Sequence, residues 1–590
     1  MRTPSVPRPL VPQRVRRRVL LWIGVGLLGA FVLVYLALFS YQLVESQLGS
    51  FAPLAAVLLL GLLLALTGPW LLIRYRRPLQ RLLFTGVHWL WVWLQSTGIP
   101  QRVAARFPRL VGFLRARLAL TPTGLTLSFG LMATGALLWI VLELLVEVVI
   151  GSSTVGVDRR ILSLVAILRT PQLDQVMYTV TFLGNARTIV VLATVAVLVA
   201  LVAWRWRAAL LLLAALAASE IFFGLLSLLA QRPRPPLEDA RIVQGGFSFP
   251  SGQSALAATF YGTVAYLLIR STRREGVKAL LGVGAALLIF VIGVSRIYLG
   301  LHYPSDVLAG WAAGALWVAL VLVAEQVWDG WAPGKRSRQR SGQIRPLSRA
   351  RRAGTVAAAV VLLGATSVYL FTVYPTIPPP PTLPASAPTI IAPSAIASVV
   401  ERQLPHSTEG LTGHPQEPIS LVFVGTRVQL EGAFLAAGWT EAKPYGFGVL
   451  AGGVAAALTH QPDPAGPVTP SFLADQPNAL AFSLPVGKTF AQRHHIRLWT
   501  THVQISSGQP LWLATASFDQ GFELAPSTFL PTHRIAPDID TERAFVAASL
   551  ERTGLVTSSL IIQLVPPESG HNFDGDPFHT NGQAVILQLS

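Results

Sequence analysis

The chain has 590 residues, of which 52% are hydrophobic and 13% are charged, so it is too apolar for an ordinary soluble enzyme and indicates a membrane protein. The absence of cysteine excludes disulfide bonds and thiolate metal sites. The net charge of +18 does not indicate a nucleic-acid partner, because residues 1–395 hold 37 Lys and Arg against 12 Asp and Glu, whereas residues 396–590 hold 9 against 16.

Nine apolar segments are long enough to cross a hydrocarbon core of about 30 Å. They cover residues 19–40, 51–73, 123–149, 187–204, 208–230, 254–270, 277–296, 305–326 and 354–374. Basic clusters before the first segment, at 74–117 and at 335–352 fall on one side of the membrane if the N-terminus is cytoplasmic. The segments 150–186, 231–253 and 297–304, and everything after residue 375, are then predicted to lie outside.

Residues 1–122 form a first membrane region with two spans. The first span is longer than the apolar core of a signal peptide and no small-residue cleavage site follows it, so we expect a retained anchor. The basic stretch 74–122 is predicted to form interfacial helices, because Trp89, Trp91 and Trp93 suit the headgroup level. The outer segment 150–186 carries three Arg and is also expected to hold an interfacial helix.

Three acidic residues lie inside predicted spans, where an unpaired carboxylate facing lipid is costly. Glu143 and Glu147 are one turn apart near the outer end of their span, and Glu220 lies in another. Two interpretations remain open: the three carboxylates pair between helices, or they line a polar entry for a substrate.

Three polar patches interrupt the apolar segments at their outer ends: QRPRPP at 231–236, PSGQ at 250–253 and SRIYLGLHYPSD at 295–306. Two of them lie at predicted helix starts, where free backbone N–H groups and the helix dipole favour an anion. Arg234 and Arg296 add guanidinium groups that can each donate two hydrogen bonds to phosphate oxygens. The three patches together predict a phosphate-binding site.

His302 and Asp306 lie one helical turn apart in the third patch. An imidazole there can attack phosphorus, and the carboxylate can hold its tautomer and stabilise the imidazolium. The alternative is that Arg, Ser and His at span ends extend towards the interface or cap helices. A single patch favours this alternative, but three patches on one face favour a functional site.

These residues resemble the motifs of the type 2 phosphatidic acid phosphatase family, which are K-x6-R-P, P-S-G-H and S-R-x5-H-x3-D. The resemblance covers about residues 123–326 and implies an all-α bundle of six membrane helices with its site at the outer face of a bacterial cytoplasmic membrane. It implies His302 as nucleophile and Asp306 as its partner. It implies the following phosphate ligands: Arg234, Ser251, Gly252, Ser295 and Arg296.

Two positions depart from the family pattern. Ser227 stands where the first motif has lysine, and Gln253 stands where the second motif has the histidine that acts as general acid. Both remain candidate phosphate-binding residues. An amide can orient a phosphate oxygen but cannot protonate a leaving alkoxide. Glu238 and Asp239 are the nearest substitute acids by sequence.

The two departures leave three functions open. The first is hydrolysis of a lipid diphosphate such as an isoprenoid diphosphate, through a phosphohistidine and without a cofactor or metal, because a phosphate leaving group needs less acid assistance than an alcohol. The second is an inactive lipid-phosphate-binding or scaffold protein of the cell envelope. The third is phosphoryl transfer to an acceptor other than water.

A Pro-rich stretch at 374–393 is predicted to be an extended spacer. Beyond it, alternation of apolar residues predicts strands at 419–425, 494–505, 510–518 and 559–565, and helices at 428–437 and 541–552. This is a soluble α+β domain of nearly 200 residues. Its segments SLVFVGTRVQLEGAFLAAGW, RHHIRLW, ATASFD and THRIAPDIDTER resemble the LssY C-terminal domain family, a resemblance that assigns no biochemical role. An envelope protein or ligand is expected as the partner of this exported domain.

Histidines in this domain raise the question of a metal site. The candidate ligands are His494, His495, His502 and His533 with Asp538 or Asp540, and, less strongly, His571 and His579 with Asp574 and Asp576. Neighbouring side chains on a strand point to opposite faces, so His494 and His495 do not readily bind one ion. The acids at 538–542 open a predicted helix, which favours capping over metal binding.

The predicted organisation is therefore a membrane helical bundle followed by an α+β domain. Its parts are a two-span region with basic interfacial helices (1–122), a six-helix phosphatase-like domain (123–326), a basic loop with the ninth span and linker (327–394), and an outer soluble domain (395–590).

Overall fold

The computed structural model describes residues 57–71, 73–74, 125–151, 153–236, 240–331, 387–443, 468, 470–486, 492–524, 531–571 and 576–590, and scattered residues between 357 and 372. The chain divides into two compact units, one of residues Val57–Ala385 and one that contains Ser386–Ser590. The predicted span 19–40, the basic stretches at 75–122 and 335–352, and the candidate acids Glu238 and Asp239 lie outside the described residues.

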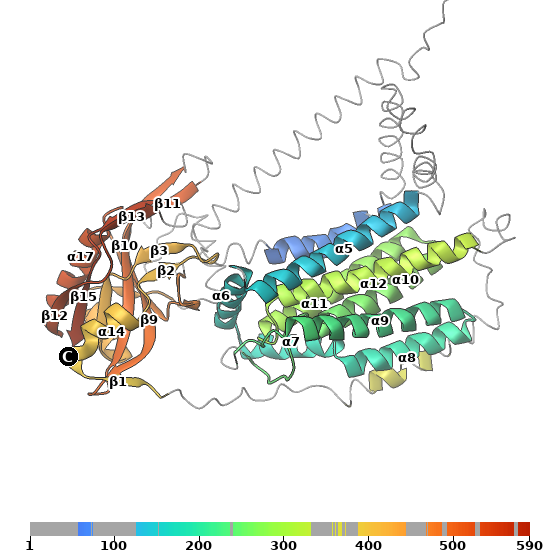
Figure 1. The fold of residues 1–590 in the computed structure, drawn as a ribbon, viewed down its shortest axis with the longest axis horizontal. Coiled ribbons are helices and arrows are strands. Elements are labelled where there is room, and N and C mark those ends of the chain that lie inside the picture. Colours follow the sequence, from blue (N-terminus) through green and yellow to red (C-terminus); the bar gives the residue numbers. More distant parts are fainter. Residues whose placement is uncertain are drawn as a thin grey trace, which may run out of the picture. The chain divides into compact units, whose positions relative to one another are not determined.

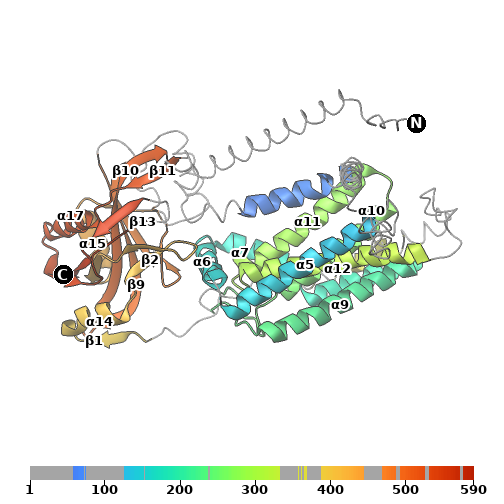
Figure 2. The same cartoon turned by 45° about the horizontal axis from the view of Figure 1, so that its top comes forward.

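The first unit is a bundle of long helices (Figures 1 and 2). Its helices are α5 (Leu125–Ile150), α6 (Ser153–Ile167), α7 (Pro171–Leu183), α8 (Ala186–Val202), α9 (Trp206–Ala230), α10 (Gly252–Ser271), α11 (Glu275–Tyr298) and α12 (Pro304–Trp331). A shorter apolar helix covers Val57–Leu71. Helices therefore form where the apolar segments of this unit predicted them.

The predicted count of nine membrane-crossing helices is not confirmed, because several of the predicted spans lie wholly or partly outside the described residues. In the described part of the chain four helices are long and apolar enough to cross a membrane, or up to five if α7 and α8 form one span bent by 46°. The bend follows from local chemistry, because Gly184 ends α7 and the Asn185 side chain caps α8 by accepting from Arg187 N at 2.9 Å. The chain is thus a multi-pass membrane protein with four or five such helices described.

Helix α10 packs against α9, α11 and α12. Small residues allow the closest of these approaches: a Cβ added to Gly314 of α12 would lie 2.3 Å from Ala258 Cβ of α10. Gly310 and Gly314 are four residues apart and form the small-residue spacing that lets membrane helices touch along their backbones. This contact holds the start of α10 against the start of α12.

The second unit is built on one twisted sheet. Its strand order is β12-β15-β4-β10-β9-β8-β5, with β1 paired to β9 and β11 paired to β10. The bounds are β1 (Thr389–Ile391), β4 (Leu421–Val424), β5 (Thr440–Glu441), β8 (Leu480–Pro485), β9 (Arg493–Ile505), β10 (Pro510–Leu524), β11 (Pro531–Ile535), β12 (Val556–Gln563) and β15 (Gln583–Leu589). Smaller sheets contain β2 (Ser407–Glu409), β3 (Pro415–Pro418), β6 (Phe472–Leu473) and β7 (Gln476–Pro477), and β13 (Glu568–His571) and β14 (Pro577–Thr580).

Helices cover both faces of the large sheet. Helices α15 (Arg427–Ala436) and α17 (Ile539–Glu551) contribute to the buried cluster on one face, which includes Phe423, Phe434 and Phe482. Helix α14 (Ile396–Gln403) contributes to the cluster on the other face, with Val422 and Trp499. The four predicted strands and both predicted helices of this domain are confirmed, with ends that differ by a few residues.

Candidate active site

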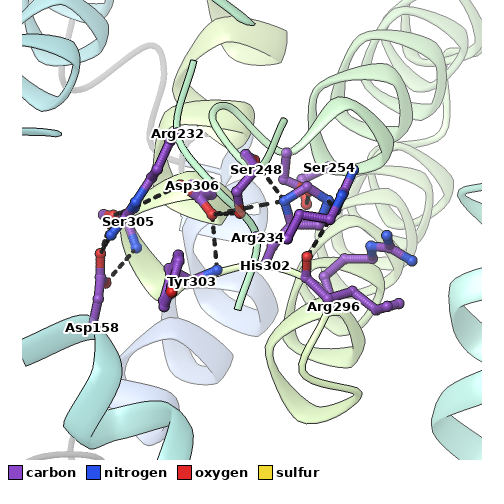
Figure 3. Close-up of polar contacts among 12 residues, drawn as sticks. Asp158, Arg232, Arg234, Ser248, Ser254, Arg296, His302, Tyr303, Ser305 and Asp306 are labelled. Carbon is purple, nitrogen blue, oxygen red and sulfur yellow. Dashed lines mark hydrogen bonds and ion pairs between the residues drawn. The ribbon is translucent and has the colours of Figure 1, made fainter. Parts of the chain in front are cut away.

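The three polar patches of the sequence meet at one end of the helical bundle (Figure 3). The first patch follows the end of α9, the second forms the start of α10, and the third runs from the end of α11 into α12. Ser251 N donates to the carbonyl oxygen of Asp306 at 2.9 Å, which joins the second patch to the third. His302 is at the centre of this cluster and is 2% exposed.

The contacts of His302 define its tautomer. Its Nδ1 lies 2.7 Å from the carbonyl oxygen of Ser248, which can only accept, so Nδ1 carries the proton. Nε2 is therefore left with a lone pair, and this nitrogen lies 3.2 Å from Nη1 of Arg234. An imidazole with a free Nε2 lone pair is the form required for nucleophilic attack.

The charge state of His302 also suits a nucleophile. Burial lowers the pKa of His302 to about 4. Asp306 opposes this shift, whereas Arg296 and Arg234 add to it. The imidazole is consequently neutral at physiological pH.

Asp306 lies beside His302 but does not set its tautomer. Its Oδ2 is 3.7 Å from His302 Nδ1, too long for a hydrogen bond, so the Ser248 carbonyl performs that role instead. Oδ2 accepts from Ser248 Oγ at 2.5 Å and from Tyr303 N at 2.9 Å, and Oδ1 accepts from Arg232 Nη1 at 2.7 Å. The carboxylate thus fixes both chain segments that flank the imidazole and places a negative charge next to it.

Arg234 and Arg296 approach the imidazole from two different segments. Arg234 donates from Nε to the Gly245 carbonyl at 3.0 Å and from Nη1 to the Leu301 carbonyl at 2.8 Å. Arg296 donates from Nη1 to Thr181 Oγ1 at 3.0 Å and from Nη2 to the Gln244 side chain. Its Nε is buried and has no hydrogen-bond partner among the described residues. An anion that reached this nitrogen would satisfy a donor that the fold leaves unused.

The second patch supplies a helix N-terminus. Ser251 precedes α10 in an extended conformation, and its Oγ lies 2.9 Å from Ser254 Oγ. A Cβ at position 252 would lie 2.9 Å from the Phe223 ring, so glycine permits the close approach of α9 and α10 there. Gln253 Oε1 accepts from Thr181 Oγ1 at 3.4 Å, which links the amide to the residue that Arg296 binds.

Two predicted phosphate-binding residues, Ser295 and Ser227, form contacts along their own helices. Ser295 Oγ donates to the Ile292 carbonyl of its own helix at 2.6 Å. Ser227 lies one turn before the end of α9, where its carbonyl oxygen accepts from Gln231 N at 3.0 Å. The Ser295 hydroxyl is thus held by its own helix, whereas the Ser227 contact involves backbone atoms alone.

Sequence reasoning missed two charged residues of the cluster, Arg232 and Asp158. Arg232 Nη2 donates to Asp158 Oδ2 at 2.8 Å, and both side chains are buried. The QRPRPP patch contains two arginines, but the family motif drew attention only to Arg234. Asp158 is the only acidic residue of α6, and this was the sole signal that marked it.

The structure assigns a contact to one of the two acidic residues of α5 that were singled out in the sequence. Glu147 accepts a hydrogen bond from Thr154 Oγ1 near the start of α6. This contact favours the structural interpretation for Glu147, because the carboxylate joins two consecutive helices.

The histidines of the second unit form separate contacts. His494 Nδ1 lies 2.9 Å from both carboxylate oxygens of Glu542 and its ring stacks on Phe545, whereas His495 Nδ1 lies 3.3 Å from Asp519. Among the described residues no group of three His, Asp or Glu is placed to hold a metal ion. The side chain of His533 and the whole of Asp574 lie outside the described residues.

The acids before α17 cap that helix. Asp538 is its N-cap and accepts from the backbone N–H groups of Asp540 and Thr541 at 3.0 and 3.1 Å. Asp540 and Glu542 lie in the first turn, where negative charge meets the positive end of the helix dipole. The predicted capping of this helix is confirmed.

Comparison with known proteins agrees with both sequence resemblances. The PAP2 superfamily model matches residues 208–328, and the LssY C-terminus model matches residues 401–584. Phosphatidylglycerophosphatase B of Bacillus subtilis (strain 168) is 31% identical over 169 residues, which are 28% of this chain and 81% of that protein. The crystal structure of the first transmembrane PAP2 type phosphatidylglycerolphosphate phosphatase from Bacillus subtilis shares 27% sequence identity, covers 34% of this chain and 98% of its own, and has a TM-score of 0.31.

Proposed function

The chain belongs to the PAP2 superfamily, and from this membership we propose that it hydrolyses a phosphorylated lipid through a phosphohistidine on His302. The observation that carries the proposal is the neutral, buried imidazole whose Nε2 lone pair faces Arg234, in a ring whose charge Arg296 also affects. The relative phosphatidylglycerophosphatase B is named for a phosphate monoester of a lipid, which supports a lipid substrate for this chain.

The reaction begins with the terminal phosphate between Arg234, Arg296 and the N-terminus of α10. Arg234 Nη1 donates towards the His302 lone pair, so a phosphate oxygen must take over this donor before attack. Nε2 then forms a bond to phosphorus while the bond to the leaving oxygen breaks. Arginines and backbone N–H groups stabilise the charge that spreads over the phosphoryl oxygens.

In the second half of the reaction the phosphohistidine is hydrolysed and the free enzyme is regenerated. Water attacks phosphorus, the phosphorus–nitrogen bond breaks, and its electron pair returns to Nε2 of His302. Asp306 lies close enough to stabilise the positive charge that the imidazole carries while it is phosphorylated. Inorganic phosphate leaves, and the net reaction consumes one water.

Gln253 determines which leaving group this site can expel. General acid catalysis contributes about 10² to 10⁴ in rate, and the amide cannot supply it. An alkoxide leaving from a monoester needs that proton, whereas a lipid phosphate leaving from a diphosphate is already a weak base. We therefore propose a lipid diphosphate, such as an isoprenoid diphosphate, as the preferred substrate.

The site is proposed to face the outside of a bacterial cytoplasmic membrane. The bundle end opposite to the site carries a cluster of basic residues at the start of α9 and around the turn from α10 to α11: Arg205, Arg207, Arg270, Arg273 and Arg274. Basic loops are retained in the cytoplasm, which directs the other end outwards. The LssY C-terminal unit is proposed to lie on that outer side and to bind an envelope protein or ligand.

The second candidate function is lipid-phosphate binding without catalysis. It is favoured by the same two departures, Gln253 and Ser227, because a binding site needs the arginines but neither a general acid nor a lysine. The two functions differ in whether the P–O bond breaks.

The deciding experiment is phosphate release by the purified full chain from a panel of lipid diphosphates and lipid monophosphates. We expect release from the diphosphates, abolished in His302→Ala, and transient labelling of wild type by ³²P-diphosphate. Faster turnover of monoesters would refute the diphosphate preference. Binding of both classes without release would establish the binding function instead.

Gln253→His distinguishes a specialised enzyme from a decayed one. The variant restores the family's general acid, so monoester turnover is expected to rise by about 10² or more while diphosphate turnover changes little. A wild type that is inactive on every lipid but rescued by Gln253→His with Ser227→Lys would indicate a decayed enzyme.

A further inference from the structure

Asp158 is a buried carboxylate that none of the motifs includes. It lies on α6, before the matched segment 208–328, and is 2% exposed. Its Oδ1 accepts from Ser305 N at 3.0 Å, and its Oδ2 accepts from Arg232 Nη2 at 2.8 Å and from Ser305 Oγ. Every one of these donors belongs to the segments that form the active site (Figure 3).

Arg232 connects Asp158 to the residue beside the nucleophile. Its Nη1 donates to Asp306 Oδ1 at 2.7 Å and to Ser305 Oγ at 2.8 Å, while Nη2 holds Asp158. The guanidinium carbon lies 4.1 Å from the centre of the Tyr303 ring. The guanidinium is thus held in one orientation, with one carboxylate on each side.

Asp158, Arg232, Asp306 and His302 lie in a row in which carboxylates alternate with basic groups. Burial disfavours the charged guanidinium, but Asp306 and Asp158 outweigh that effect and raise the pKa of Arg232. Burial also raises the pKa of Asp158, while the contact with Arg232 acts in the opposite direction. The ion pair with Arg232 and the two hydrogen bonds from Ser305 favour the charged form of the Asp158 carboxyl.

The row matters because Asp306 is shared between two cations. His302 becomes positive when its Nε2 is phosphorylated, and Asp306 is the carboxylate that faces it. Arg232 also forms an ion pair with Asp306, and Asp158 partly neutralises the charge of Arg232 from its other side. Without the negative charge of Asp158, the positive charge of Arg232 would be neutralised by Asp306 alone. Asp306 would then stabilise the imidazolium of His302 less.

We infer that Asp158 is a positioning residue for the phosphohistidine reaction: it balances and orients Arg232, and through Arg232 it adjusts the support that Asp306 gives to His302. This inference rests on the proposed function for its catalytic meaning. Its electrostatic content concerns His302 alone and is measurable without turnover.

The test compares three variants of the full chain in detergent. Asp158→Asn keeps the shape and removes the charge. Asp158→Asn with Arg232→Gln removes both charges and leaves Asp306 unopposed. Asp174→Asn is the matched control, because Asp174 is an equally buried carboxylate that pairs with Arg241 at 2.6 Å and accepts from Tyr298 at 2.9 Å but has no contact with Asp306 in the described structure.

The first measurement is the pKa of His302, from NMR of isotopically labelled histidine, with His302→Ala for assignment. The charged groups that face this ring are Asp306, Arg234 and Arg296. Asp158→Asn is expected to lower the pKa by about half a unit, less than the shift of about 1 to 3 units that a directly contacting charge produces. The double variant is expected to raise it above the wild-type value, and Asp174→Asn to leave it unchanged.

The second measurement is turnover of a lipid diphosphate and the yield of labelled phosphohistidine. Asp158→Asn is expected to lower kcat about tenfold with KM within about twofold, because the phosphate ligands are untouched. The acid limb of its pH profile should move to lower pH, and the double variant should recover part of kcat and move the limb the other way.

The outcomes distinguish the inference about Asp158 from the proposed phosphatase function. A merely structural role predicts fewer folded molecules in both variants with His302 unchanged, and that result would overturn the inference. If the wild type releases no phosphate from any lipid while the pKa shifts appear in opposite directions, the coupling of Asp158 to His302 stands and the proposed phosphatase function fails.

Discussion

Gly310→Ala tests whether the site depends on the close contact between α10 and α12. A Cβ at position 310 would lie 2.6 Å from the carbonyl oxygen of Ser251, 3.0 Å from Ser254 Cβ and 3.2 Å from Ala255 N. The oxygen belongs to Ser251, which caps the start of α10, and it accepts from Ala255 N at 3.0 Å. The added methyl therefore meets backbone atoms that cannot rotate away.

The size of the effect follows from these distances. Carbon and carbonyl oxygen atoms normally approach to about 3.3 Å, so the start of α10 must move by about 0.7 Å relative to α12. The movement carries Ser251, Gly252 and Gln253 away from His302. Overpacking of this kind costs about 1–3 kcal/mol of stability, and a misplacement of nearly 1 Å lowers catalysis by roughly tenfold to a hundredfold.

The assay is steady-state phosphate release together with thermal unfolding of the full chain. Gly224→Ala in α9 and Gly284→Ala in α11 are the controls, because no atom in the described structure lies within 4 Å of a Cβ at either position. Both controls are expected to keep activity, with a stability gain of up to about 1 kcal/mol from the better helix propensity of alanine. Wild-type kcat in Gly310→Ala would show that the site does not depend on this contact.

Three further results are expected. Asp306→Asn should lower kcat by about 10² to 10⁴ and destabilise the bundle by about 3–5 kcal/mol. The reason is that both oxygens of Asp306 accept hydrogen bonds, so the amide NH₂ of Asn must face a donor, and the charge of Arg232 loses a partner. Unchanged kcat would contradict this role. With the pKa of His302 lowered from 6.5 to about 4, kcat/KM should stay flat as the pH is lowered to about 5 and should fall only below it. The stability of the fold should decrease as the pH is lowered from 6.5 to 4, because the unfolded chain binds a proton that the folded chain excludes. An acid limb near pH 6.5 would show that the ring is solvated. Asp538→Ala should lower the stability of the second unit by about 1 kcal/mol through the loss of the α17 cap, measured by thermal unfolding of the full chain, and an unchanged transition would show that water replaces the cap.

Local chemistry allowed much of this protein to be predicted from its sequence. Apolar runs placed α5, α9, α11 and α12 because a membrane helix needs a continuous apolar stretch, and alternation placed β9 and β10 because one strand has two faces. The three polar patches were expected to converge, and they do, since all lie at helix ends on one side of the bundle. Residues 171–183 were assigned to the outer segment 150–186 and a separate span was predicted from residue 187, so the possibility that α7 and α8 form one bent span was not foreseen.

The sequence by itself determined the membrane class and the family and predicted His302 as the nucleophile, because these depend on composition and on spacings of a few residues. Only the tertiary structure decided which groups surround the imidazole. Ser248 lies 54 residues from His302, Arg232 lies 74 residues from both Asp306 and Asp158, and Asp158 lies 147 residues from Ser305. Contacts over such separations arise when helices pack, and no periodicity along the chain encodes which polar side chain will face which.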